Sequence, residues 1–146
     1  MSKNIFLLRR FNQEVAKGNI HSAQKILDRC RNPFTSAQVM NERLEDLMFN
    51  AVRNGDTEKV KSFLDFGFST DTVDFWGSSA LHIAVKQGSL AIVELLMSRG
   101  AKVNSLDDHW STPLDLATLF KRAEISAFLK QHGAKRFEEL CPKRSD

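Results

Sequence analysis

The chain lacks any long apolar run. A membrane-spanning helix needs about 18 or more consecutive apolar residues, and no stretch of the sequence approaches that length. The apolar run at residues 5–8 is too short for a signal-peptide core, and Arg9 and Arg10 follow it rather than precede it. We therefore expect no membrane partner and a cytoplasmic protein, unless a leader segment was removed before the chain was numbered.

The chain also has little excess charge of either sign. Its 21 basic and 18 acidic side chains give a formal net charge of +3, to which the terminal Lys143 and Arg144 contribute. Proteins that bind nucleic acids usually gather their basic residues on one face. So mild a balance gives no reason to expect a nucleic-acid partner.

Sequence motifs of catalysis are missing as well. The chain has no Gly-rich phosphate loop, no G-x-S-x-G, no H-E-x-x-H and no C-x-x-C. Asp107 and Asp108 are adjacent carboxylates, but we expect them in a solvated turn. The histidines lack the spacing of metal ligands: His21, His82, His109 and His132. We expect no enzymatic activity, no catalytic residue, no metal and no cofactor.

What the chain does have is an internal repeat with an offset of 33 residues. Residues 74–107 and 107–140 are two copies of one pattern, aligned without a gap. The matched positions include Leu81 and Leu114, Ala84 and Ala117, and Gly100 and Gly133. A fixed period of this length indicates stacked supersecondary units, none of which can bury its apolar face alone.

Both copies carry the signals of a helix pair. Ser79 and Thr112 can each cap the start of a first helix. Pro113 suits the first helical position, because the N–H that proline lacks would be unpaired there anyway. Gly100 and Gly133 can adopt the left-handed conformation that follows the end of a second helix.

These same residues resemble a known family. SALHIA at residues 79–84 and TPLDLA at residues 112–117 are similar to the T-P-L-H-x-A pattern of ankyrin repeats, whose period is also 33. The resemblance implies an all-α ankyrin-repeat solenoid with short β-hairpin-like tips. It also implies that His82 hydrogen-bonds the turn of an adjacent repeat. Asp115 occupies that position one copy later, so we expect a weaker network there.

Weaker copies precede the two strong ones. Gly55 and Gly18 match the inter-helix glycine Gly88, although Gly18 precedes Gly55 by 37 residues rather than 33. The extra residues fall in a polar stretch around Pro33, which we interpret as a loop. We therefore expect one domain, 1–146, with about four helix pairs. The predicted units are approximately 4–30, 41–67, 74–104 and 107–140, with a loop insertion at 31–40.

Such an array brings only neighbouring units into contact. Cys30 and Cys141 lie near opposite ends of the sequence, so we expect both to be reduced thiols. Phe137 and Leu140 should cover the exposed apolar end of the last unit.

In ankyrin proteins the hairpin tips and the exposed end of each first helix form a concave groove that binds other proteins. The resemblance implies that the partner-binding positions in this chain are Arg53, Phe75, Trp76, Ser78, Lys86, Gln87, Asp108, His109, Trp110, Ser111, Leu119 and Phe120. Exposed apolar patches mark interaction sites, and Trp is enriched among binding hot spots. Two alternatives are open, because a tip Trp can pack on a neighbouring tip and Phe120 can cap the last helix pair.

Two residues depart from the family pattern. Trp110 stands where the preceding tip has Gly77, and Lys121 stands where Gly18, Gly55 and Gly88 stand in the other units. A positive φ at Lys121 would cost on the order of 1 kcal/mol. Either the last unit is locally remodelled, or its turn has a different shape.

Three functional hypotheses follow. The first is a non-enzymatic module, monomeric in isolation, that binds a protein partner through the groove. The basic Arg53 and Lys86 hint at a partner with an acidic surface. The second is a dedicated inhibitor or self-protection protein that covers the active site of a partner enzyme, which a small chain without a second domain would suit. The third, a binder of nucleic acid or of a small ligand, has the least support.

Overall fold

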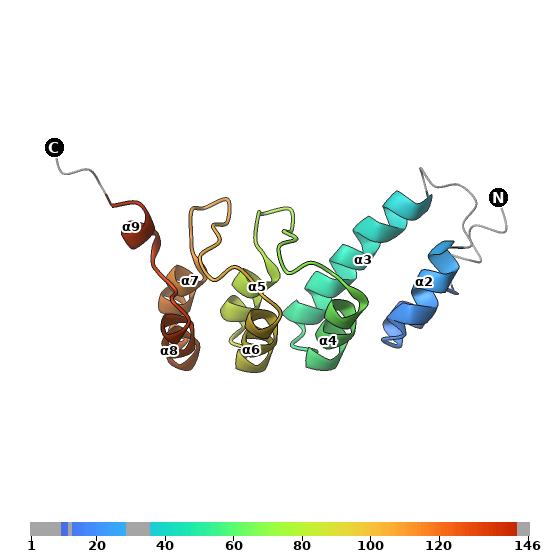
Figure 1. Ribbon diagram of the computed structural model, residues 1–146, viewed down its shortest axis with the longest axis horizontal. Coiled ribbons are helices and arrows are strands. Elements are labelled where there is room, and N and C mark those ends of the chain that lie inside the picture. The colour runs from blue at the N-terminus through green and yellow to red at the C-terminus, as the bar shows by residue number, and fades with distance from the viewer. Residues whose placement is uncertain (1–9, 12, 29–35, 143–146) are drawn as a thin grey trace.

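A computed structural model describes residues 10, 11, 13–28 and 36–142. These residues form an elongated stack of helix pairs, with the first and last helices at opposite ends (Figure 1). The described residues contain no β-strand, and a single antiparallel bridge joins Val73 to Ser79 at the base of one tip. The predicted all-α solenoid with hairpin-like tips is confirmed.

The helices lie in two rows. The first helices of the units are α3 (Ser36–Arg53), α5 (Ala80–Gln87) and α7 (Pro113–Leu119), and the second helices are α4 (Thr57–Phe66), α6 (Leu90–Ser98) and α8 (Ala123–Gln131). An earlier helical stretch, 13–16, leads into α2 (Ile20–Asp28), and α9 (Phe137–Leu140) follows α8. Helices α3, α5 and α7 pack side by side in one row, and α2, α4, α6 and α8 form the other.

Helix α3 corrects one prediction. It begins at Ser36, so residues 36–40 are helical and not part of a loop insertion at 31–40. Residues 31–35, with Pro33, lie outside the described residues. The polar residues of this stretch suggested a loop, but most of residues 37–53 are good helix formers, and neither glycine nor proline interrupts them. The helix can therefore start well before the apolar face of its unit begins.

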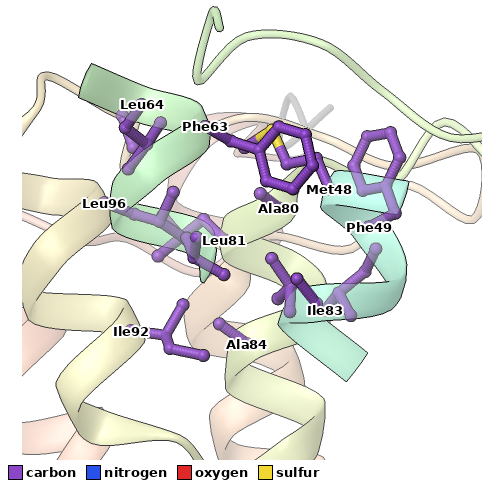
Figure 2. Packing of buried hydrophobic residues seen from close by; sticks show 14 of the residues in the cluster. Met48, Phe49, Phe63, Leu64, Ala80, Leu81, Ile83, Ala84, Ile92 and Leu96 are labelled. Carbon is purple, nitrogen blue, oxygen red and sulfur yellow. The ribbon is translucent and has the colours of Figure 1, made fainter. Parts of the chain in front are cut away.

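The core runs continuously between the two rows. Figure 2 shows its central part, where Phe63 of α4 and Met48 of α3 pack against the start of α5. Leu81, Ala84 and Leu96 are buried at these contacts. Each unit supplies apolar side chains to both neighbours, which is why one unit alone has no complete core.

No helix in the described part of the chain is long and apolar enough to span a bilayer. Of the two cysteines, Cys141 is an exposed free thiol. Cys30 lies outside the described residues, and its reduced state stays a prediction.

Candidate partner-binding groove

Each tip is built around one aspartate. The Asp74 Oδ1 atom accepts hydrogen bonds from the backbone N–H groups of Trp76 (2.9 Å) and Ser78 (3.0 Å). A short polar side chain that bonds the backbone two residues ahead is the usual way in which Asp fixes a turn. The backbone that carries the Trp76 ring is therefore fixed by hydrogen bonds to the Asp74 side chain.

The tip of the next unit repeats this geometry. The Asp107 Oδ1 atom accepts from the N–H groups of His109 and Ser111, both at 2.9 Å. Asp107 is only 6% exposed, whereas Asp108 is exposed. The expectation of a solvated carboxylate pair was therefore wrong for Asp107, because its carboxylate accepts the N–H groups of its own turn.

The two tips also touch each other. The Asp108 N–H donates to the carbonyl oxygen of Trp76 at 3.3 Å. A Cβ atom at Gly77 would lie 2.2 Å from the Asp108 Oδ1 atom, and Gly77 has φ +67°. Glycine adopts this left-handed backbone without strain, and a Cβ here would force the Asp108 side chain to move.

The tip of the fourth unit keeps the same backbone without glycine. Trp110 has φ +61°, and Lys121, at the end of the inter-helix turn, has φ +55°. The last unit is thus not remodelled at either place. Left-handed backbone costs about 1–2 kcal/mol for a residue with a Cβ, so both positions carry backbone strain.

Below the tips, His82 connects the third unit to the fourth. Its Nδ1 atom accepts from the Ser79 N–H at 3.2 Å, and its Nε2 atom lies 3.0 Å from the Ser111 carbonyl oxygen. Because a backbone N–H only donates and a carbonyl only accepts, the ring is a neutral imidazole with its proton on Nε2. Burial lowers the pKa of His82, although the bond to Ser111 and the charge of Asp107 oppose that shift. The structural role implied for His82 is confirmed.

Asp115, one unit later, corrects a third prediction. Its carboxylate accepts from the Phe137 N–H at 2.9 Å, from the Arg136 guanidinium at 3.1 Å and from the Thr112 backbone N–H at 3.1 Å. Burial raises the pKa of Asp115, but these hydrogen bonds together outweigh it and lower the pKa below 3.8. The network here is not weaker than at His82, since the C-terminal segment supplies donors to the carboxylate.

Between the tips and the first helices lies a hollow of about 420 Å³. It is lined by Arg53, Asp74, Trp76, Ser78, Ile83, Lys86, Gln87 and His109. Residues of α3 and α5 line one side of this hollow, and residues of the two tips line the other. Six of the predicted partner-binding residues line this hollow, and Asp74 and Ile83, which the sequence did not predict, line it as well. The alignment of Asp74 with Asp107, at the start of each tip, was the signal that could have identified Asp74.

The large apolar side chains predicted at the surface are exposed. The exposed fractions are 89% for Phe75, 60% for Trp76, 65% for Trp110, 71% for Leu119 and 43% for Phe120. Each tip also has one pair of neighbouring aromatic rings. The Phe75 and Trp76 rings meet edge to face with centroids 5.3 Å apart, and the Trp110 ring lies 6.1 Å from that of Phe137.

The polar positions differ in how much surface they offer. Ser78 is 3% exposed and has little side chain to give a partner. Arg53 donates to the Asp74 Oδ2 atom at 3.1 Å and to the Asn50 Oδ1 atom at 3.2 Å. Gln87, Asp108 and His109 are exposed. In the described part of the chain no cluster of His, Cys, Asp and Glu is placed to hold a metal ion.

Comparison with known proteins agrees with this geometry. A family model for ankyrin repeats, in three copies, matches residues 15–137. The chain is 38% identical over 89 residues to serine/threonine-protein kinase 12 of Arabidopsis thaliana, which covers 61% of this chain and 19% of the kinase. It is 36% identical over 91 residues to protein phosphatase 1 regulatory subunit 27 of Mus musculus, which covers 62% of this chain and 59% of that protein.

A third relative is the RelA-associated inhibitor of Mus musculus, 33% identical over 88 residues, or 60% of this chain and 11% of the inhibitor. The chain thus spans between about a tenth and three fifths of the lengths of these relatives. What it shares with each of them is a stretch of the length of a few repeats.

Proposed function

Because the chain belongs to the ankyrin-repeat family, whose repeats are protein–protein interaction modules, we propose that it binds a protein partner through the hollow and the two tips. The proposed contact surface joins the exposed rings of the tips to the ends of helices α3, α5 and α7. The proposed action is binding without catalysis, by a monomer, in the cytoplasm.

One observation carries this proposal. Trp76 presents a largely exposed indole at the rim of a hollow, on a turn fixed by Asp74 and by the neighbouring tip. A rigid aromatic side chain loses little conformational entropy when a partner covers it. Aromatic anchors beside a pocket are the common form of a binding hot spot.

A narrower function is favoured by the names of two relatives. One is a regulatory subunit of a phosphatase and another is an inhibitor. We propose as the second candidate that this chain inhibits or protects a partner enzyme by covering its active site. The basic side chains of Arg53 and Lys86 would suit an enzyme with an acidic surface.

The test is affinity capture with the full chain from lysate of its own source cell. The control bait is the Trp76→Ala/Trp110→Ala double variant, checked for native helicity. We expect a protein retained by the parent and lost by the variant. If the captured protein is an enzyme, its activity with and without added chain separates inhibition from recruitment. Equal capture by both baits, or a salt-sensitive shift of labelled nucleic acid in place of a protein, would contradict the proposal.

A further inference from the structure

The side chains at the ends of the first helices, along the groove, change from cationic to apolar from unit to unit. Arg53, Lys86 and Leu119 are successive members of one position, each 33 residues after the last, near the end of a first helix. The position is cationic on α3 and α5 and apolar on α7. The next position follows the same course, with the polar Gln87 replaced by Phe120.

The two cations are not equivalent. Arg53 forms an ion pair with Asp74 of the following tip. The corresponding carboxylate for Lys86 is Asp107, which is buried and whose Oδ1 atom already accepts from two backbone N–H groups. Within the described residues Lys86 forms no ion pair. The hollow therefore contains an ammonium group that forms no ion pair with a carboxylate of the described residues.

The other end of the groove is apolar and open. Leu119 and Phe120 are exposed at the end of α7, and Trp110 projects from the tip of the same unit. Trp110 holds its exposed position at a positive φ, where the preceding tip has glycine. Backbone strain that places an exposed side chain is an observation from which function can be inferred.

We infer that the groove recognises one polarised segment of its partner protein, acidic at one end and apolar at the other. The acidic side chain enters the hollow beside Lys86 and Arg53, and the apolar side chains cover Leu119 and Phe120. This inference rests on the proposed function and adds the chemistry and direction of the partner segment. Charge complementarity at the hollow selects and orients the segment, while burial at the apolar end contributes affinity.

Single-stranded nucleic acid is the competing occupant, because phosphates pair with cations and bases stack on aromatic rings. The groove favours a protein segment instead. Asp74 carries a negative charge beside the two cations, and the chain as a whole carries a formal charge of only +3. Binding of a labelled oligonucleotide to the chain distinguishes the two occupants in the experiment.

The experiment selects displayed random peptides on the immobilised full chain. We expect peptides with Asp or Glu a few residues from bulky apolar side chains. Selection on Lys86→Glu should shift the charged position to Lys or Arg, and a synthetic peptide selected on the parent should bind Lys86→Glu at least ~10-fold more weakly. Leu119→Lys should remove the apolar preference and leave the acidic one. Lys130→Glu, an exposed change of the same charge on α8, is the matched control and should change neither.

Lys86→Gln repeats the test if Lys86→Glu does not fold, and should weaken the acidic preference without reversing it. If peptides depend on Trp76 but show no acidic preference, or keep it in both Lys86 variants, the inference is overturned and the proposed groove stands. If the selected peptides bind Trp76→Ala and Trp110→Ala like the parent, both the inference and the proposed function fail. Failure to enrich any peptide, or tighter salt-sensitive binding of a labelled oligonucleotide, would also overturn the inference.

Discussion

Asp115 lies one repeat after His82, and both side chains hydrogen-bond the backbone of the segment that follows in the stack, His82 as a donor and Asp115 as an acceptor. His82 presents an N–H at Nε2 to the carbonyl oxygen of Ser111, 3.0 Å away. The Asp115 carboxylate can only accept, and it does so from the N–H of Phe137 at 2.9 Å. Each bond ties the first helix of a unit to the segment that follows it in the stack.

The first prediction concerns the stability that His82 contributes. His82→Ala should lower the free energy of unfolding by about 1 kcal/mol, because it removes buried hydrogen bonds at both ring nitrogens. Urea unfolding at pH 8 measures this loss. An unchanged midpoint would mean that the histidine contributes nothing to the stack and would reopen a functional role for it.

The second prediction is the pH dependence of the same residue. Burial holds the pKa of His82 below 6.5 in the folded chain, so well above pH 6.5 the ring is neutral in both states. As the pH falls below 6.5, the unfolded chain takes up a proton that the folded chain does not, and stability falls until the pH passes the lowered folded pKa. The loss of stability below pH 6.5 should be smaller in His82→Ala than in the parent. An equal loss of stability below pH 6.5 in the parent and in His82→Ala would contradict this account.

The third prediction concerns the C-terminal segment. Asp115→Ala should destabilise the chain by about 1–3 kcal/mol, since it leaves N–H groups without their acceptor and removes one of the two bonds of the capping box with Thr112. Amide hydrogen exchange gives the local measurement, and the Phe137 amide should exchange much faster in the variant. Glu138→Ala, an exposed change within α9, is the control. Equal protection of the Phe137 amide in parent and Asp115→Ala would contradict the role assigned to the carboxylate.

The fourth prediction tests the strain at Lys121. Lys121→Gly should raise the free energy of unfolding by about 1 kcal/mol, because glycine adopts φ +55° without the steric cost of a Cβ. Lys121→Ala keeps the Cβ and removes only the rest of an exposed side chain, so it should leave stability nearly unchanged. A glycine variant less stable than the alanine variant would show that the left-handed backbone is not costly here.

The sequence alone predicts most of the fold, and its failures have physical causes. The repeat from Ser79 to Gly133 places α5 to α8, because caps, apolar spacing and glycines all agree there. The predicted loop at residues 36–40 is wrong because polar residues are compatible with both a loop and an exposed helix. At Asp107, no local pattern distinguishes a solvated carboxylate from one that accepts the N–H groups of its own turn.

The candidate site was predictable in position but not in its interactions. The family resemblance places Trp76, Lys86 and His109 around one groove, since equivalent positions of successive repeats align along the stack. It does not reveal that Arg53 is paired with Asp74 while Lys86 has no such pair among the residues that the structure describes. That difference depends on where each neighbouring carboxylate points, which a repeat alignment does not contain.

The measurement that tests the account most directly is the affinity of the captured partner for Trp76→Ala and Trp110→Ala. Hot-spot truncations typically cost about 2 kcal/mol or more, so Trp76→Ala should weaken binding at least ~30-fold in isothermal titration calorimetry. Lys130→Ala, on the opposite row of helices, should bind like the parent. If both tryptophan variants fold normally and bind as tightly as the parent, the groove and tips are not the binding surface.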